Sequence, residues 1–340
     1  MSERLEDIAV KMVADGKGLL AADESTATNK KRFDTIALVS TEESRRDYRE
    51  MLFRSDDAMK KYISGVILYE ETLFQKAANG TPFVDIIRTA GGIPGIKVDT
   101  GAKPLAGFPG ETVTEGLDGL ADRLAKYYDA GARFAKWRGV ISISDTLPTY
   151  GAIKANAHAL ARYAALCQQA KIVPIVEPEV LMDGVPGTHD LDRSEEVTRR
   201  TLQIVFQELA DARVSLEGMI LKPSMVIDGK KLRKASVEQV AERTVKVLKE
   251  TVPSAVPGIA FLSGGQTSEE ATAHLSAING YDLPWDVTFS YGRALQDAAL
   301  KAWDGKPENV AAGQRAFTHR AEMNYLAAKG SWTKNSEKAA

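Results

Sequence analysis

The sequence has few residues of the kinds that form cross-links or hold metals. Its 340 residues include one cysteine, Cys167, so no disulfide can form within the chain. Cys167 lies in the helical-looking stretch ARYAALCQQA, where we expect it to be a buried core residue. The four histidines are scattered and form neither an HxH nor an HExxH pattern. We therefore expect no resident metal ion.

Long apolar runs and blocks of one charge are also missing. No stretch approaches the roughly 18 consecutive apolar residues that a membrane-spanning helix needs. The N-terminal stretch MSERLEDIAVKMVADGKG is charged throughout and lacks the apolar centre of a signal peptide. A formal net charge of −2 without a basic block argues against nucleic acid or an anionic membrane as the main partner. We expect a soluble, cytoplasmic protein.

What the sequence does contain is a series of short apolar runs separated by helical patterns. Continuous runs of this length, rich in Val, Ile and Phe, are typical of buried parallel strands. The spacing of Leu117, Leu120 and Leu124 is typical of the helices between them. The eight runs cover residues 18–25, 64–71, 95–99, 133–139, 172–179, 217–223, 258–265 and 286–293.

This alternation predicts the α/β class and a (β/α)8 TIM barrel. We expect a single domain over residues 1–330, with an extra N-terminal helix within residues 1–16. Residues 331–340, SWTKNSEKAA, are polar and predict a short flexible tail.

Charged residues lie where these runs end. In a TIM barrel the C-terminal ends of all strands face one mouth, where active sites are built. Lysines and glutamates are not the residues that turns require, so their presence at this mouth indicates chemistry. The residues are Asp23, Lys97, Asp99, Lys136, Arg138, Glu177, Glu179 and Lys222.

A lysine amine attacks a carbonyl carbon only when it is neutral, and fewer than about one lysine in a thousand is neutral at pH 7. Burial and a second cation both favour the neutral form. Lys136 and Lys222, on the fourth and sixth runs, can share one layer of the barrel interior. Such a pair suits an amine that forms an imine with a ketone. The alternative is that both lysines form structural ion pairs with the glutamates.

Imine formation also requires a group that moves protons. Glu177, on the fifth run between the two lysines, is placed for this role. Glu179 lies on the same face of the strand, because side chains alternate along a strand. A solvated pair at a strand end is the alternative interpretation of these two glutamates.

The last two runs end in loops that are typical of phosphate sites. Glycines let backbone N–H groups approach an anion, and an arginine adds charge. In TIM barrels the loops after strands seven and eight often bind phosphate. Together with the lysines, these loops predict a phosphorylated carbonyl substrate. The candidate residues are Ser263, Gly264, Gly265, Ser290, Gly292 and Arg293.

Several longer motifs occur in one order over about residues 8–330: LAADEST, RRDYRE, SGVILYEETL, GIKVDTG, FAKWR, IVPIVEPE, LKPSM, FLSGGQ and TFSYGRALQ. With these motifs the chain closely resembles class I fructose-bisphosphate aldolase. The resemblance implies a lyase of glycolysis and gluconeogenesis. Such an enzyme reversibly cleaves fructose 1,6-bisphosphate to dihydroxyacetone phosphate and glyceraldehyde 3-phosphate. It uses a covalent imine and no metal cofactor, and the resemblance also implies a homotetramer.

The resemblance assigns a role to each matching residue. Lys222 matches the Schiff-base lysine, and Glu177 the general acid/base with Glu179 beside it. Asp23 matches the aspartate that assists at the C4 hydroxyl. Lys136 matches the lysine that favours the neutral amine and contacts substrate. The residues that match the C1 phosphate pocket are Ser263, Gly264, Gly292 and Arg293. Further expected substrate contacts are Gly265, Ser290 and Arg138. The residues that match the C6 phosphate region are Ser25, Thr28, Arg32 and Lys97. Arg45 is a further expected substrate contact.

The chain departs from the family pattern at two places. The motif usually written LKPNM is LKPSM here, and we expect Ser224 to have little effect. Many animal members end in a tyrosine that moves a proton at the enamine, whereas the last tyrosine here is Tyr325. The group that protonates the enamine, and the preference between fructose 1,6-bisphosphate and fructose 1-phosphate, therefore stay open.

Two other functions fit parts of the pattern. A transaldolase shares the barrel and an imine-forming lysine, but it handles a monophosphate ketose and its lysine is placed differently. A catalytically idle barrel that binds cytoskeletal filaments would tolerate the loss of Lys222, Glu177 or Asp23. All three are present.

Overall fold

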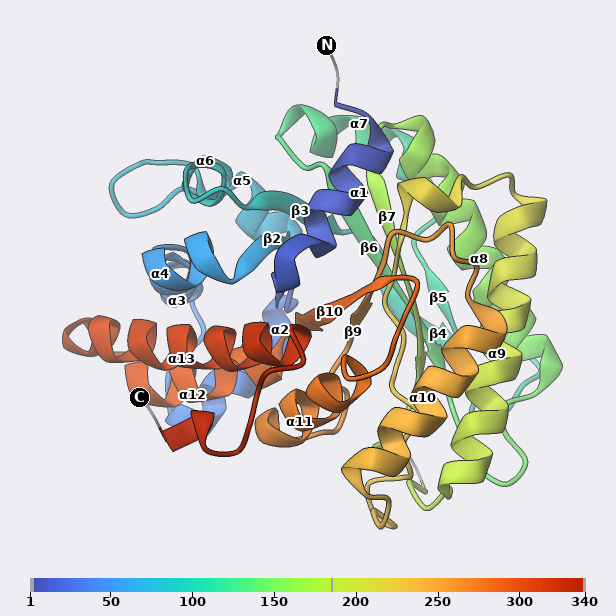
Figure 1. Ribbon diagram of the computed structural model, residues 1–340. Helices are drawn as coiled ribbons and strands as arrows, with labels where there is room; N and C mark the ends of the chain where they lie inside the picture. The colour runs from blue at the N-terminus through green and yellow to red at the C-terminus, as the bar shows by residue number, and fades with distance from the viewer. Residues whose placement is uncertain (1–2, 185, 339–340) are drawn as a thin grey trace.

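Eight parallel strands close into a barrel in the computed structural model, which describes residues 3–184 and 186–338 (Figure 1). Each strand overlaps one of the apolar runs, so the predicted (β/α)8 TIM barrel is confirmed. Every residue of β1, β2 and β7 is buried, which explains why these runs are continuous rather than alternating. The barrel strands are β1 (Gly18–Ala22), β2 (Ile63–Leu68), β3 (Ile93–Lys97), β6 (Phe134–Ile141), β7 (Val173–Val180), β8 (Ile220–Leu221), β9 (Gly258–Phe261) and β10 (Asp286–Tyr291).

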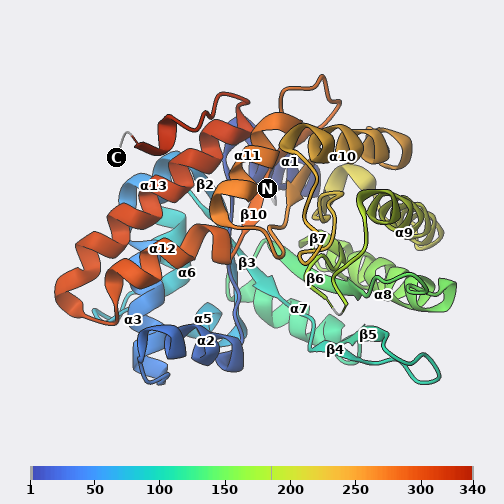
Figure 2. The ribbon, with the colours of Figure 1, turned by 90° about the horizontal axis from the view of Figure 1, so that it is seen from below.

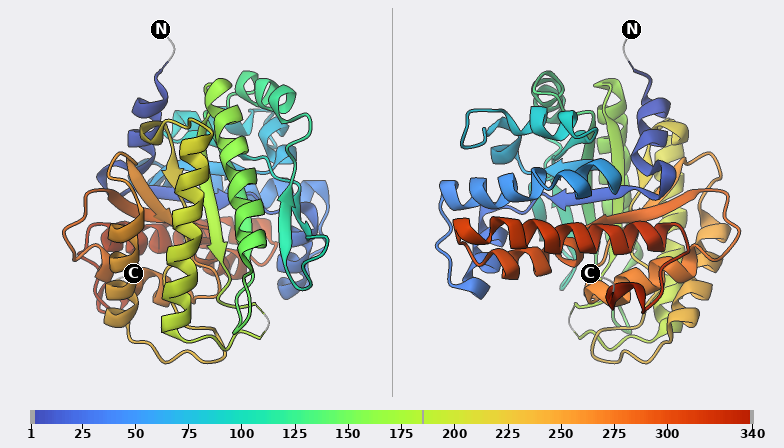
Figure 3. Two further views of the ribbon diagram at one scale, coloured as in Figure 1. Left: turned by 90° about the vertical axis from the view of Figure 1, so that its right-hand side faces the viewer. Right: turned by 60° about the vertical axis from the view of Figure 1, so that its left-hand side comes forward.

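Helices surround this barrel on its outside (Figure 2). In Figure 3, α8 and α9 run side by side along the strands, and the long helix α13 lies against α12. No helix in the described part of the chain has the length and hydropathy needed to cross a bilayer. The longer α-helices are α2 (Thr26–Phe33), α3 (Glu42–Phe53), α7 (Leu120–Asp129), α8 (Tyr150–Gln169), α9 (Leu191–Asp211), α10 (Val237–Thr251), α11 (Ser268–Ile278), α12 (Arg293–Trp303) and α13 (Val310–Ala328). Shorter ones are α4 (Asp56–Lys61), α5 (Glu70–Phe74) and α6 (Phe83–Thr89).

The predicted N-terminal helix is α1 (Leu5–Val13), and it packs against the barrel interior. Its buried residues Ile8, Met12 and Val13 belong to one apolar cluster with inward residues of the strands, such as Phe134. The helix approaches the sheet so closely that a Cβ on Gly258 would lie 2.6 Å from Val13. Helix α1 thus covers the end of the barrel where the strands begin. The charged residues at the C-terminal ends of the strands lie at the opposite end.

A two-stranded antiparallel hairpin was not predicted from the sequence. It consists of β4 (Gly101–Pro104) and β5 (Thr112–Glu115) and follows the third barrel strand. The Thr114 amide donates to Asn156 Oδ1 on α8 at 3.2 Å, and its hydroxyl donates to the carbonyl of Arg138 at 2.6 Å. The hairpin is therefore held against α8 and β6.

The segment after Gly330 makes contacts that its polar composition does not indicate. Trp332 packs against the core, and its indole N–H donates to Glu337 at 3.1 Å. Glu337 also accepts from Arg320 of α13 at 2.6 Å. In the described part of the tail these contacts dock it on the body of the protein, so its flexibility stays a prediction. Residues 339 and 340 lie outside the described residues.

Candidate active site

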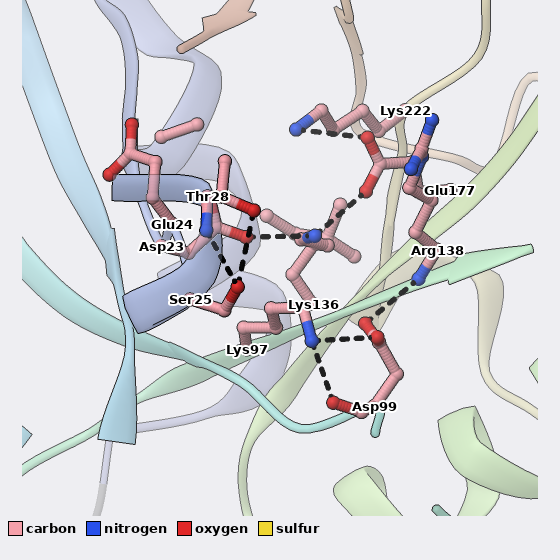
Figure 4. A network of polar contacts seen from close by, with 12 residues as sticks. Asp23, Glu24, Ser25, Thr28, Lys97, Asp99, Lys136, Arg138, Glu177 and Lys222 are labelled. Atoms are coloured by element: carbon pink, nitrogen blue, oxygen red, sulfur yellow. Dashed lines mark hydrogen bonds and ion pairs between the residues drawn. The ribbon is translucent and has the colours of Figure 1, made fainter. Parts of the chain in front are cut away.

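Lys222 directly follows the two-residue strand β8, where the chain is held on both sides. Its amide donates to the carbonyl of Val176 at 2.8 Å, and the carbonyl of Pro223 accepts from Leu262 at 3.2 Å. These bonds extend the ladder beyond β8 and fix the backbone next to a restricted proline. The side chain is 4% exposed and points into the barrel, where it meets Glu177 (Figure 4).

Glu177 lies between the two buried lysines. Its Oε1 is 3.1 Å from Nζ of Lys222, and its Oε2 is 3.3 Å from Nζ of Lys136. The three side chains come from β7, from the end of β8 and from β6, so Glu177 on the middle strand contacts both lysines (Figure 4). The same carboxylate can therefore exchange a proton with either amine.

Lys136 also pairs with Asp23, at 2.8 Å. Burial alone would raise the pKa of Asp23, but the charges of Lys136 and Lys222 outweigh it and lower this pKa to about 2. Burial likewise opposes the charge on Lys136, yet Asp23 and Glu177 raise its pKa above the ordinary lysine value. The structure thus places a charged Lys136 between two carboxylates. Ion pairing, the alternative interpretation of the lysines, is present together with the predicted cluster.

Glu179 and Arg138 form a second pair at the same strand ends. Arg138 Nε donates to Glu179 Oε2, and the two residues lie on the neighbouring strands β6 and β7. Both side chains line the cavity, so Glu179 is not a solvated residue at a strand end.

A cavity of about 580 Å³ opens beside Lys222. From the predicted set it is lined by Lys222, Glu177, Glu179, Arg138, Thr28, Arg32, Ser263, Gly264, Ser290, Gly292 and Arg293. It therefore brings Lys222 together with residues from both groups of phosphate candidates. The lining also includes Lys31, Thr35, Asp297, Leu300 and Lys301, which the sequence analysis missed. Asp297 and Lys301 follow Arg293 on α12 at helical spacing, and that spacing was the signal that could have found them.

The loops after β9 and β10 meet at this cavity. Arg293 Nη2 donates to the carbonyl of Gly264 at 2.8 Å, which joins the two loops. Gly264 has a φ of +46°, and a Cβ there would lie 2.5 Å from Met182, so a side chain would be both strained and crowded. The hydroxyl of Ser290 is buried and has no hydrogen-bond partner within residues 3–184 and 186–338. A polar ligand would satisfy it.

Other predicted residues do not line the cavity. Asp23 pairs with Lys136, and Lys136 in turn contacts the cavity residue Glu177. Ser25 caps α2 by accepting from the amide of Thr28 at 3.3 Å. Lys97 pairs with Asp99 at 2.7 Å. Gly265 lies in a neighbouring cavity of about 740 Å³.

Arg45 of the RRDYRE motif is also outside the cavity lining. Its guanidinium forms a two-point ion pair with Glu71, with an Nε to Oε1 distance of 2.9 Å. Its role as a substrate contact stays a prediction.

The loop that carries Asp23 is fixed by buried polar groups that the sequence analysis also missed. Arg49, which is 1% exposed, donates to the carbonyl of Glu24 at 2.9 Å. Gln296 donates to the Glu24 carboxylate at 2.9 Å and to the carbonyl of Ala21 at 2.7 Å. Glu24 in turn pairs with Arg32 at 2.6 Å, which places that guanidinium at the cavity. The RRDYRE helix thus supports the site through Arg49.

The family model of class I fructose-bisphosphate aldolase, of the glycolytic type, matches residues 4–340 of this chain. The chain belongs to the class I fructose-bisphosphate aldolase family. It is 55% identical to a probable class 1 aldolase of Xanthomonas campestris pv. campestris, with 97% of this chain and 98% of that protein covered. It is 54% identical to fructose-bisphosphate aldolase C of Rattus norvegicus, with 97% and 91% covered.

A solved relative has the same fold. The Plasmodium falciparum aldolase, crystallised in a ternary complex with TRAP and a small-molecule inhibitor, superimposes with a TM-score of 0.94. It is 49% identical, and the match covers 97% of this chain and 95% of that one. Class I aldolases are lyases that work through a Schiff base, and this aldolase has a buried lysine at its barrel mouth as that chemistry requires.

The aldolase accommodates its LKPSM variation without an unpaired group. The hydroxyl of Ser224 is buried and donates to the carbonyl of Val180 at 2.9 Å. The serine therefore ties the loop after β8 to the end of β7.

Proposed function

We propose that this aldolase cleaves fructose 1,6-bisphosphate through an imine on Lys222. The observation that carries the proposal is the contact of Lys222 with Glu177 beside a cavity lined by phosphate candidates. Ser263, Gly264, Gly292 and Arg293, with Ser290 and Gly265, take the C1 phosphate. Thr28 and Arg32, with Ser25 and Lys97, take the C6 phosphate, and Arg45 and Arg138 are further substrate contacts.

Glu177 and Lys222 carry the first half of the reaction. Glu177 accepts a proton from the Lys222 ammonium, and the neutral amine attacks the C2 carbonyl to give a carbinolamine. The protonated Glu177 then donates this proton to the departing hydroxyl, which leaves as water while the iminium forms. Lys136 stabilises the Glu177 carboxylate between these transfers, and Glu179 holds Arg138 beside the substrate.

The iminium then accepts the electrons of the C3–C4 bond. Asp23 assists removal of the C4 hydroxyl proton, C3–C4 breaks, and glyceraldehyde 3-phosphate leaves from an enamine. Protonation at C3 and hydrolysis of the iminium release dihydroxyacetone phosphate. Tyr325 packs against Tyr62, with ring centroids 5.2 Å apart, and it does not line the cavity. The C3 proton therefore comes from water or from a cavity side chain.

We also propose that the reaction needs no metal ion, because the iminium is the electron sink that a Lewis acid would otherwise provide. By family resemblance we propose a cytoplasmic homotetramer that takes phosphorylated ketoses and trioses. Analytical ultracentrifugation tests the tetramer, and an assay with EDTA tests the metal.

Borohydride trapping tests the central step. Incubation with dihydroxyacetone phosphate and borohydride should attach the triose to Lys222, as read by peptide mass. The Lys222→Met variant should form no adduct and lose activity. Lys31→Met, which changes an exposed lysine of the same cavity, should still be trapped. Trapping at another lysine, or activity that EDTA abolishes, would refute the scheme.

A further inference from the structure

Asp297 lines the cavity of about 580 Å³ beside Lys222, called the substrate cavity below, and its carboxylate has no hydrogen-bond or ion-pair partner among the described residues. Arg293, Asp297 and Lys301 are spaced four residues apart on α12, so they form one stripe along the helix. All three line both the substrate cavity and the neighbouring cavity of about 740 Å³. Asp297 therefore lies on the boundary between the two.

The other acids of the substrate cavity are already paired. Glu177 contacts Lys222 and Lys136, and Glu179 contacts Arg138. No hydrogen bond or ion pair joins Asp297 to residues 3–184 or 186–338. An acid stabilises a helix when it lies in the first turn. Asp297 is the fifth residue of α12 and therefore lies beyond that turn. Neither pairing nor helix capping explains an aspartate here.

The charges around Asp297 come from several elements. The cations that act on Asp297 are Arg293 and Lys301 of its own helix and Arg32 of α2. Burial raises the pKa of Asp297, and these three cations act against that rise. The charge of Asp297 also contributes to the raised pKa of Tyr48 on α3. Across the two cavities the remaining charged groups are Lys31, Arg138, Glu177, Glu179, Lys222, Lys230, Arg233 and Glu270.

We propose that Asp297 sets how tightly the cavity holds phosphate, because its carboxylate lines the cavity beside Arg293 and Arg32 and repels the incoming phosphate. The proposal rests on the proposed placement of a phosphate at Arg293. An arriving dianion would face a carboxylate of like charge in a partly buried site. Asp297 relieves this repulsion by taking up a proton as the phosphate binds. Phosphate binding is then weaker at high pH and tighter as the pH falls.

The sign of this linkage follows from the two states of Asp297. A bound dianion raises the affinity of Asp297 for protons, so the bound state holds more protons than the free state. Affinity for the dianion therefore increases as the pH is lowered toward the range in which Asp297 is protonated in the complex.

Inorganic sulfate is the probe, because it stays a dianion across this pH range. We would measure its dissociation constant by calorimetry between about pH 5.5 and pH 8 for the wild type, Asp297→Asn and Asp7→Asn. Asp7→Asn makes the same charge change on α1, which packs against the other end of the barrel. At pH 8 we expect Asp297→Asn to bind sulfate on the order of three- to tenfold more tightly than the other two. This difference should shrink as the pH falls.

A second measurement keeps the proposal testable if the variant folds poorly. Sulfate binding to the wild type, repeated in buffers with different ionisation enthalpies, should show proton uptake. Equal sulfate affinity of wild type and Asp297→Asn at pH 8, or no proton uptake by the wild type, would overturn the proposal. These readouts need no catalysis, so they fail independently of imine trapping at Lys222. If the trapping fails but sulfate binding responds as expected, only the proposed function falls.

Discussion

Glu177 Oε1 lies 3.1 Å from Nζ of Lys222, a hydrogen-bond distance between two side chains that are each about 5% exposed or less. So close a carboxylate would hold an isolated lysine in its charged form. Here the second oxygen of Glu177 faces Lys136 at 3.3 Å, so the carboxylate is shared. In the proposed mechanism this shared carboxylate accepts the Lys222 proton and later returns it to the substrate.

The first prediction concerns this proton transfer. Glu177→Gln keeps the shape of the side chain but cannot carry a proton. We expect kcat to fall by about 10²- to 10⁴-fold, the usual contribution of a general acid or base. Steady-state cleavage of fructose 1,6-bisphosphate measures it. Glu179→Gln is the comparison, because Glu179 pairs with Arg138 and does not contact Lys222. An equal loss in both variants would argue against Glu177 as the proton carrier.

The second prediction concerns the charge of Asp23. Its pKa of about 2 depends on Lys136 first and Lys222 second, acting against burial. Lys136→Met removes the cation that most lowers the pKa of Asp23, while burial still raises it, so this pKa should rise. In the proposed mechanism activity needs ionised Asp23, so the acid limb of the pH profile of kcat should move to higher pH. Lys97→Met should move it less, because Lys97 acts more weakly on Asp23. An unchanged acid limb in Lys136→Met would contradict the link.

The strands and the catalytic cluster could be predicted from the sequence because the barrel imposes a simple rule. Strands that are buried on both faces give continuous apolar runs, and their C-terminal ends must converge. Lys136, Glu177 and Lys222 were placed together by that rule alone.

Other parts of the site could not be predicted because they depend on contacts between distant segments. Nothing near Glu24 in the sequence indicates that Arg49 and Gln296 hold it. In the hairpin β4 is mostly exposed and β5 has a single buried residue, so neither strand gives a buried apolar run. The tail looks free by composition, yet Glu337 contacts α13. In each case the stabilising partner is visible only in three dimensions.

The third prediction concerns Arg49, which supports the Asp23 loop from α3. Lysine keeps the charge but lacks the forked guanidinium that reaches the carbonyl of Glu24. We expect Arg49→Lys to lower kcat about tenfold through a displaced Asp23, on the order of the effect of a small misplacement. Arg54→Lys is the matched control, since Arg54 pairs only with Glu50 of the same helix among the described carboxylates. Equal kinetics of Arg49→Lys and the wild type would show that the loop holds its position without Arg49.

The fourth prediction concerns stability and pH at Glu195, which joins α9 to α10. Burial would raise the pKa of Glu195, but contacts with Lys246, Arg243 and Arg199 lower it to about 2. Its stabilising effect is therefore complete above the unfolded pKa of about 4.3 and is lost as the pH falls toward 2.

Thermal unfolding at several pH values measures the pH range over which Glu195 stabilises the protein. At pH 7, Glu195→Gln should lower Tm by a few degrees, roughly 2–4 °C if about 1 kcal/mol is lost. The difference from the wild type should narrow between pH 4.5 and pH 3. Glu196→Gln should change Tm little, because Glu196 is 61% exposed and pairs only at the surface. A Tm difference for Glu195→Gln that does not depend on pH would exclude the linkage.

The last prediction concerns the tail that follows α13. Glu337 accepts from Arg320 at 2.6 Å and from the Trp332 indole at 3.1 Å, and Arg320 also donates to Thr272 of α11 at 2.6 Å. Glu337→Gln removes the charge that these donors share, so residues 331–338 should exchange amide hydrogens faster while α11 stays protected. Hydrogen–deuterium exchange with mass spectrometry measures both segments. Ser331→Ala, which removes only a hydroxyl contact to the carbonyl of Leu326, should leave the exchange unchanged. If the tail of the wild type already exchanges at the rate of an unstructured chain, the flexible tail expected from its composition is the correct description, and the contacts of Glu337 contribute little.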